Sequence, residues 1–341
     1  MRRYFIFLLL SVIVVSCRNN ESLFCGKLVP VETFEKEYHL VGSMEQIDTI
    51  GAFQIDFSAP YLIITQYKLP YFIKVYDSKT RNIRANLAHR GEGPNEFLSF
   101  SILNQQHDSI LWAQDYHKKK LLGIDLQKSI EQKNNVVRKS LDYKKINDPL
   151  QVFYCNDSLL LIKNIEHGLG VQYVKFNPFC PDGNMTRFFM YNPILLQQDL
   201  NLMMSLADCL KPDGKMIASL TGVLNQIDIL NLEDSTQNFS VKMGDGPTSI
   251  EDIRQNRETL YDYYISIPRC NDSLIFALYC NKEENGKKEF HVINWEGKAL
   301  FKLFINEDLR DFNIDWQNGK LYGITNNDIV YVYDVNNIVK T

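Results

Sequence analysis

The chain has 341 residues, of which 45% are apolar and 23% are charged, close to the average for globular proteins. This composition excludes a wholly disordered chain, a collagen and a coiled coil. With 37 Lys and Arg against 41 Asp and Glu, the formal net charge is −4, so we expect no nucleic-acid partner. The 20 Phe, 18 Tyr and 3 Trp residues favour β structure over a helical bundle.

The N-terminus resembles the signal of a bacterial lipoprotein. A basic start precedes an apolar run (residues 4–15) that is shorter than the roughly 20 residues of a membrane-spanning helix. The run ends in Val14-Val15-Ser16-Cys17, which looks like a lipobox, where a signal peptidase cuts before a lipidated cysteine. The alternatives are an ordinary signal peptide with a chance cysteine, or a buried N-terminal strand.

This resemblance implies a cellular location as well as a cleavage site. We expect a signal peptide over residues 1–16, a membrane anchor at Cys17, a tether over residues 17–36 and one domain over residues 37–341. Residue 18 is Arg rather than Asp, which in such lipoproteins implies the outer membrane. Because no acidic run follows the cysteine, we expect the periplasmic face rather than the cell surface.

A short turn signature followed by an apolar run recurs six times, at intervals of 46 to 59 residues. Alternating strands follow each apolar run, so each unit reads as four strands. Four strands in about 50 residues, repeated six times, predict an all-β, six-bladed β-propeller of four-stranded antiparallel blades. A pair of β-sandwiches would not explain the recurring turn. The signatures begin at Ser58, Asp108, Asp157, Asp213, Asp272 and Asn318.

Three segments complete this predicted architecture. The sixth unit lacks an outer strand, and residues 37–42 are expected to supply it and so close the ring. Residues 193–206 have helix-like apolar spacing after a proline, and residues 248–260 open on a capping-box pattern. We therefore expect short helical insertions in the loops between blades.

Two glycine-rich loops follow the expected outer strands of the first and fourth units. They share a Gly-x-Gly-Pro pattern, Gly91-Glu92-Gly93-Pro94 in the first and Gly244-Asp245-Gly246-Pro247 in the second. Such loops, behind a lipobox and six β-repeats, resemble those of TolB-like six-bladed propeller lipoproteins of Bacteroides-type Gram-negative bacteria. The resemblance covers essentially all of the chain after the tether, and most of that family has no assigned activity. The loop residues are Gly91, Glu92, Gly93, Pro94, Glu96 and Phe97 in the first, and Gly244, Gly246 and Pro247 in the second.

These loops have a structural and a binding interpretation. Glycines permit close backbone approach, and successive amides could bind an anion. A crossover in which Glu96 caps backbone amides and Phe97 seals the core between blades is favoured. The loop lacks the lysine and the strand–loop–helix context of a nucleotide phosphate site.

The cysteines and histidines do not form a recognisable metal motif. There is no CxxC or HExxH pattern, and the six histidines are scattered, so we expect neither a metal site nor a cofactor. Cys155 and Cys270 occupy the same place in two copies of Cys-Asn-Asp-Ser-Leu, which indicates a repeated small core position. A full disulfide framework is not expected, although a Cys270–Cys280 bridge within one hairpin remains open.

Candidate catalytic residues are sparse. The apolar runs after the turns, such as residues 62–65, are taken as the inner strands of the blades, and no carboxylate recurs along them. Asp115-Tyr116-His117 is the one place where an acid and a histidine share a probable loop, for which a solvated turn is favoured.

The Asp-Ser-Ile turn at 108–110 and the Asp-Ser-Leu turns at 157–159 and 272–274 also resemble O-glycosylation sites of Bacteroides-type bacteria, as does Asp48-Thr49-Ile50. Good turn chemistry before a strand explains the Asp-Ser pairs equally well.

The sequence therefore favours a non-catalytic binding module for a protein, peptide or glycan, held by a lipid at Cys17. The alternative is a propeller-type hydrolase or lyase with a metal in the central channel.

Overall fold

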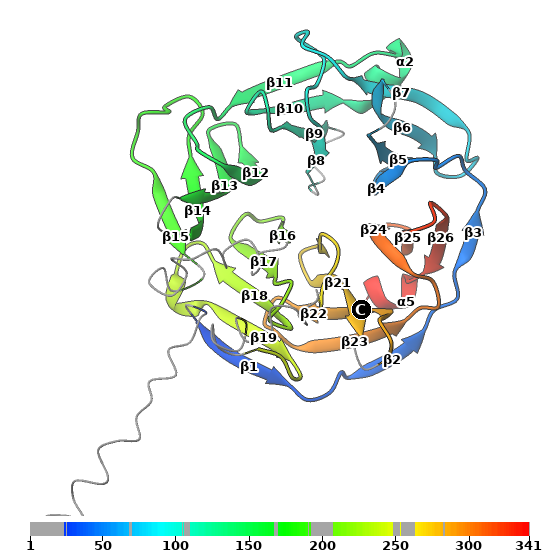
Figure 1. Cartoon of the computed structure of the whole chain (residues 1–341), viewed down its shortest axis with the longest axis vertical. Coiled ribbons are helices and arrows are strands. Elements are labelled where there is room, and N and C mark those ends of the chain that lie inside the picture. The colour runs from blue at the N-terminus through cyan, green and yellow to red at the C-terminus, as the bar shows by residue number, and fades with distance from the viewer. Residues whose placement is uncertain are drawn as a thin grey trace, which may run out of the picture.

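The computed structural model shows six β-sheets arranged as blades around a central axis (Figure 1). This is the predicted six-bladed β-propeller with four antiparallel strands in each blade. None of the helices in the described part of the chain is long and apolar enough to cross a membrane. The structure describes residues 24, 26–67, 70–103, 105, 110–166, 170–189, 191, 207–247, 253, 263–281 and 284–340.

Blades one to three are each built from four strands that are consecutive in the chain. The first of them lies nearest the centre of the ring and the fourth lies at its rim (Figure 1). Blade one contains β4 (Ala52–Ser58), β5 (Tyr61–Gln66), β6 (Tyr71–Asp77) and β7 (Ile83–His89). Blade two contains β8 (Ser101–Ile102), β9 (Ile110–Asp115), β10 (Lys120–Asp125) and β11 (Val137–Asp142). Blade three contains β12 (Pro149–Asn156), β13 (Leu159–Glu166), β14 (Gly170–Phe176) and β15 (Thr186–Phe189).

Blades four to six each include a strand from the N-terminal segment. Blade four contains β16 (Ala207–Leu210), β17 (Met216–Leu220), β18 (Gln226–Asn231) and β19 (Phe239–Met243), with β1 (Lys27–Val31) added parallel to β19. Blade five contains β20 (Arg269–Cys270), β21 (Leu274–Asn281), β22 (Lys287–Asn294) and β23 (Ala299–Phe304), with β2 (Lys36–His39) parallel to β23. Blade six contains β24 (Leu309–Asp315), β25 (Lys320–Thr325), β26 (Val330–Asp334) and β3 (Ser43–Glu45).

The ring is closed by the N-terminal chain, but not by the segment that the sequence predicted. Residues 37–42 were expected as the outer strand of blade six, whereas that strand is β3. Much of the predicted segment belongs to β2 on blade five. Residues 27–31 of the segment expected as a tether (17–36) form β1, which is paired along blade four. These parallel additions bury backbone groups without any hairpin turn that a sequence pattern could reveal.

The core lies between the blades. Six clusters of buried apolar side chains occupy the six junctions between neighbouring blades. Along β5, Leu62 and Ile64 face blade six while Ile63 faces blade two, because successive side chains on a strand point to opposite sides. Aromatic rings span these junctions, as in the stacked pair Phe57 and Tyr322 with centroids 5.5 Å apart.

The strands that surround the channel are not the ones predicted. The apolar runs after the turns, taken as inner strands, are the second strands of their blades, β5, β9, β13, β17, β21 and β25. The first strand of each blade, before the turn, lies nearest the axis (Figure 1). In each blade the successive strands lie progressively farther from the axis. The predicted inner strands are therefore one position farther from the axis than the true ones.

The described helices are short. α2 (Leu126–Gln132) lies inside blade two, between its third and fourth strands, and Asp125 caps its N-terminus. η1 (Ser235–Gln237) and α5 (Asn336–Val339) complete the set in the described segments. The helices predicted over residues 193–206 and 248–260 fall outside the described residues, apart from a helical Ile253.

The five described cysteines are all free thiols: Cys155, Cys180, Cys209, Cys270 and Cys280. The Cys270–Cys280 bridge is therefore absent. Burial raises the pKa of the Cys155 thiol to about 11, in keeping with its role as a small apolar side chain.

Candidate functional site

The first glycine loop joins blade one to blade two, and its own glutamate closes it. The Gly93 amide donates to the Glu96 carboxylate at 2.9 Å, and this bond lowers the pKa of Glu96. A Cβ at Gly91 would lie 2.0 Å from the same carboxylate, so a larger residue there would displace the Glu96 side chain. Lys118 donates to the carbonyls of Gly93 and Glu96 at 2.9 and 2.8 Å. Because the Gly93 amide already donates its hydrogen bond to the Glu96 carboxylate, this amide is not free to bind an external anion.

Phe97 lies at the end of this loop and is fully buried in the cluster between blades one and two. Its ring makes an edge contact with Phe100, with centroids 4.9 Å apart. The loop residues therefore have structural contacts of the kind expected from the sequence, and any binding role for them stays a prediction.

The second glycine loop follows β19 and is held by an amide side chain instead of a glutamate. Asn225 donates to the carbonyls of Met243 and Asp245, the latter at 2.8 Å. Gly244 has φ of +77°, a conformation that side chains disfavour. A Cβ at Gly246 would come within 3.0 Å of Asn225, so the loop packs closely on this residue.

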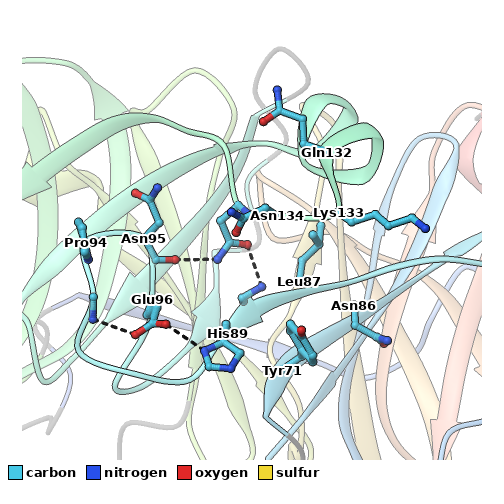
Figure 2. Close-up of a pocket in the computed structure, with 13 residues that line it drawn as sticks. Tyr71, Asn86, Leu87, His89, Pro94, Asn95, Glu96, Gln132, Lys133 and Asn134 are labelled. Atoms are coloured by element: carbon cyan, nitrogen blue, oxygen red, sulfur yellow. Dashed lines mark hydrogen bonds and ion pairs between the residues drawn. The ribbon is translucent and has the colours of Figure 1, made fainter.

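Each glycine loop borders a cavity. The cavity beside the first loop, called the blade-one cavity here, has a volume of about 600 Å³ (Figure 2). Such a volume is typical of small-ligand sites. Tyr71 and His89 contribute rings with centroids 5.3 Å apart, and five amide side chains border the cavity. These amides belong to Asn86, Asn95, Gln132, Asn134 and Asn135.

Asn135 ties the blade-one cavity together. Its side chain accepts a hydrogen bond from the Ala88 amide at 2.8 Å and donates one to the Asn95 carbonyl at 2.7 Å. His89 lies 3.2 Å from the Glu96 carboxylate, between the strand edge and the loop (Figure 2). Amide side chains donate and accept hydrogen bonds without gaining or losing protons, so the lining suits recognition of a polar ligand.

The cavity beside the second loop, called the blade-four cavity, has a volume of about 500 Å³. The chain that links β1 to β2 borders it, and the Phe34 ring lies 4.8 Å from the His291 ring. Burial lowers the pKa of His291. Burial alone would raise the pKa of Glu289, but His291 and Lys302, 3.0 and 3.2 Å from its carboxylate, lower it overall.

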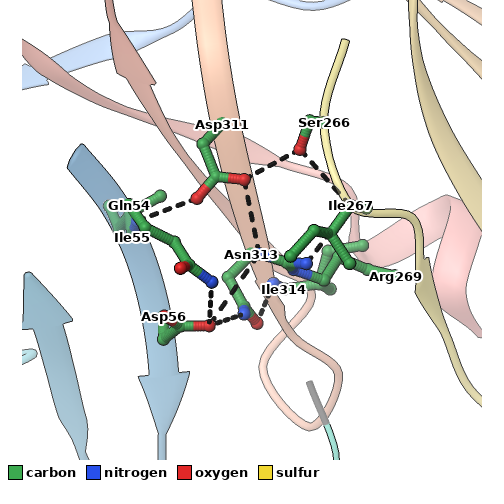
Figure 3. Close-up of polar contacts among 9 residues, drawn as sticks. All are labelled: Gln54, Ile55, Asp56, Ser266, Ile267, Arg269, Asp311, Asn313 and Ile314. Carbon is green, nitrogen blue, oxygen red and sulfur yellow. Dashed lines mark hydrogen bonds and ion pairs between the residues drawn. The ribbon is translucent and has the colours of Figure 1, made fainter. Parts of the chain in front are cut away.

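A polar cluster that could have been expected from the sequence but was not joins the innermost strands of blades one, five and six, and is called the channel cluster (Figure 3). Arg269 lies between two buried carboxylates, 3.8 Å from Asp56 and 3.4 Å from Asp311. Ser266 donates to Asp311 at 2.8 Å, and Asn313 donates to Asp56 at 3.2 Å. The two acids and the arginine thus form one group on the innermost strands, in which Arg269 donates a hydrogen bond to Asp311 and forms an ion pair with Asp56.

Burial dominates the electrostatics of this cluster. It raises the pKa of Asp56 to about 7, and the attraction of Arg269 offsets only part of the effect. Burial also raises the pKa of Asp311. The second oxygen of Asp56 has no hydrogen-bond partner among the described residues. Near neutral pH the cluster therefore carries less negative charge than its formula suggests.

The expectation that the channel strands lack carboxylates is therefore wrong, because Asp56 lies on β4, Asp311 on β24 and Asp208 on β16. The available signal was the polar alternation before the turns, as in Gln54-Ile55-Asp56. Asp208 is fully bonded to neighbours, namely Lys163, Tyr173 and Ser219 at 2.8, 2.7 and 2.6 Å. In the described part of the chain, no three His, Cys, Asp or Glu residues are grouped as metal ligands.

Asp115 is buried rather than part of a solvated turn. Its carboxylate accepts from the amides of Leu98, His117 and Lys118, at 2.9, 3.1 and 3.0 Å. The carboxylate thus fixes the β9–β10 turn against the first glycine loop.

The candidate modification turns differ in exposure. Ser158 and Ser273 are exposed, whereas Thr49 is buried and donates to the carbonyl of Asp328. Asp108 and Ser109 lie outside the described residues.

No family model matches this chain, and no curated protein is similar to it in sequence. Solved structures that share its fold include two Bacteroides proteins. A Bacteroides fragilis protein described as exported has a TM-score of 0.52 at 12% identity, over 90% of this chain and 99% of that one. A Bacteroides vulgatus member of the DUF4221 family has a TM-score of 0.54 at 11% identity, over 88% of this chain and 93% of that one. At these identities the likeness shows the propeller fold alone.

Proposed function

We propose that this chain is a lipid-anchored binding module of the TolB-like propeller kind, on the periplasmic face of the outer membrane. The lipobox at Cys17 supports the anchor, and the export of one structural relative is compatible with it. The observation that carries the binding role is the blade-one cavity, because its lining is rich in amides and aromatic rings. The ligand classes it suits are a protein, a peptide or a glycan.

The anchor is tested by metabolic labelling with an alkyne fatty acid, followed by membrane fractionation. The native chain should incorporate the label and sediment with outer membranes, whereas Cys17→Ala should do neither. Protease added to intact cells should spare the chain if it faces the periplasm. Release of the unlabelled native chain into the soluble fraction would contradict the proposal.

The binding role is tested by photo-crosslinking in cells from the rim of the cavity. A crosslinker at Gln132, which borders the cavity, should give a discrete adduct. A crosslinker at Lys79, an exposed residue of the same blade that borders neither loop cavity, is the matched control. The same adducts from both positions would contradict a binding role for the cavity.

The alternative is a hydrolase or lyase with a metal in the central channel, for which Asp56 and Asp311 would be the candidate ligands. The Arg269 guanidinium already lies between these two carboxylates and would repel a metal ion, which counts against this alternative. Metal analysis of the purified chain decides the matter, since stoichiometric metal lost in Asp56→Asn would establish the channel site.

A further inference from the structure

The two glycine loops occupy equivalent places in the ring. Each follows the fourth strand of its blade, β7 in blade one and β19 in blade four, and each borders a cavity. When Gly91 is matched to Gly244 and Pro94 to Pro247, residues 86–90 of blade one correspond to residues 239–243 of blade four. The two edges can therefore be compared residue by residue.

In blade four, the chain's own N-terminal segment occupies this edge. β1 runs parallel to β19, with Lys27 opposite Phe239 and Val31 opposite Met243. Three residues beyond β1, Phe34 places its ring against His291 at the blade-four cavity. An extended segment that adds a strand and inserts an aromatic side chain is thus the mode of binding that this fold already uses.

In blade one, β7 is the last strand of its sheet in the described structure, but the chain just beyond its C-terminal end is already paired. Phe97 forms a parallel bridge with Arg90, and its amide donates to the His89 carbonyl at 2.9 Å. The blade-one cavity lies along β7, and a second cavity of about 350 Å³ shares Tyr71, Asn86 and Lys133 with the first. The side chain of Asn135 accepts from the Ala88 amide, as a peptide carbonyl of an added strand would. The edge that precedes Ala88 has no strand on its outer side among the described residues.

The charge along this edge selects the occupant. Arg84 and Lys133 are exposed and border the second cavity, and neither forms an ion pair with a described residue. The amide side chains around the cavity match the donors and acceptors of a peptide backbone. A cationic strand edge beside amides and aromatic rings suits an extended chain that carries carboxylates and an aromatic side chain.

We propose that the β7 edge, with its two cavities, binds an extended acidic segment of a partner protein as a fifth strand parallel to β7. This rests on the proposed binding function and assigns it a site and a ligand class. An aromatic side chain of the segment enters the blade-one cavity, as Phe34 does in blade four. Its carboxylates pair with Arg84 and Lys133.

The probe for this site is a synthetic peptide of residues 26–40 of this chain, which contains Phe34 and carries three glutamates against two lysines. Fluorescence anisotropy with the full-length chain in detergent should show saturable binding, and a scrambled peptide should not bind. Hydrogen exchange should show new protection of backbone amides in β7, with β19 and β23 unchanged. Exchange of the peptide with the chain's own segment would instead leave β7 unprotected.

Two variants make the test specific. Reversal of charge in Arg84→Glu with Lys133→Glu should weaken binding by about tenfold, because two attractive pairs become repulsive. Lys79→Glu reverses an exposed charge on the same blade away from both cavities and should leave the affinity unchanged. Absence of binding, protection elsewhere, or equal effects of the variants would overturn the β7 site. Those results would not affect the lipid labelling and crosslinking tests, on which the proposed function itself depends.

Discussion

At the scale of single residues, the first glycine loop shows how the Glu96 carboxylate fills the space that a side chain at residue 91 would need. Glu96 lies so close to residue 91 that a Cβ there would be 2.0 Å from its oxygen. The same carboxylate accepts a hydrogen bond from the Gly93 amide and lies beside His89. Part of this arrangement could be anticipated from the sequence, because the glycines, Glu96 and Phe97 are neighbours along the chain.

Gly91→Ala should therefore displace the Glu96 carboxylate and leave the Gly93 amide without its partner. We expect a lower free energy of unfolding, because the Glu96 side chain must move and the Gly93 amide then loses its hydrogen bond. Denaturant titration measures this free energy. Asn95→Ala, which shortens an exposed side chain in the same loop, should change the value by less than about 0.5 kcal/mol. Equal effects of the two substitutions would contradict the role given to Glu96.

The channel cluster makes stability depend on pH. Folding raises the pKa of Asp56 from 3.8 to about 7, so between these values the folded state binds more protons than the unfolded state. This residue therefore lowers the stability progressively as the pH rises from about 4 to about 7. Asp56→Asn removes the effect, so the variant should gain roughly 2–4 kcal/mol on the native chain over that interval.

The measurement is a series of denaturant titrations between pH 4 and pH 8. Asp77→Asn serves as the contrast, because hydrogen bonds from the amides of Thr80 and Lys79 lower the pKa of Asp77. Its contribution is lost as the pH falls below about 4, which is the opposite sign. A constant difference between Asp56→Asn and the native chain at all pH values would refute the proposed titration.

At the scale of elements, closure of the ring depends on three residues of β3. This strand pairs antiparallel with β26, with Met44 opposite Tyr331. Glu45 also receives two hydrogen bonds from Arg81 of blade one, both of 2.6 Å. β3 thus holds the last blade to the first.

Proline substitutions at neighbouring positions test this closure. Successive backbone amides on a strand point to opposite sides, and β3 has a neighbouring strand on one side only. Only one of the two amides, that of Ser43 or that of Met44, therefore donates to β26. Just one of Ser43→Pro and Met44→Pro removes a hydrogen bond between the strands. We expect that variant to lose about 1–2 kcal/mol more than the other in denaturant titration. Val41→Pro, between β2 and β3 and highly exposed, is the control. Equal stability of all three variants would show that β3 does not hold the ring closed.

The turns explain why the blades were predictable and the channel was not. All six turn signatures separate the first and second strands of their blades, and this local pattern was sufficient for strand number and blade number. The distance of each strand from the axis depends on contacts between blades, so the polar first strands were overlooked. Asp56 and Arg269 are adjacent in space but 213 residues apart, and no local pattern connects them. The parallel pairing of β1 with β19 and of β2 with β23 was missed for the same reason.

At the scale of the whole molecule, the N-terminal segment passes around half of the ring. Phe24 is buried between blades three and four, and β1, β2 and β3 then lie on blades four, five and six (Figure 1). A lipid at Cys17 would be seven residues from Phe24, a reach of at most about 25 Å. The proposed anchor therefore holds the blade-three and blade-four side of the ring near the membrane.

Blade one stands across the ring from blade four (Figure 1). The blade-one cavity and the β7 edge should then lie far from the membrane surface, open to partners in the periplasm. This arrangement can be measured with a fluorescent label at Gln132→Cys, on the cavity rim, or at Glu233→Cys, an exposed position in blade four. Exposed Cys180 is first replaced by Ser so that it does not take up label.

In vesicles that contain quencher-bearing lipids, the lipidated chain should lose more fluorescence from the label at position 233 than from the label at 132. The reason is geometric, because the short link to the lipid restricts blade four to the neighbourhood of the surface and leaves blade one free of it. The Cys17→Ala chain, which has no anchor, should show little quenching at either position. Equal quenching at both positions in the lipidated chain would mean that the ring lies flat on the membrane, and the β7 edge would then have to compete with lipid for its partner.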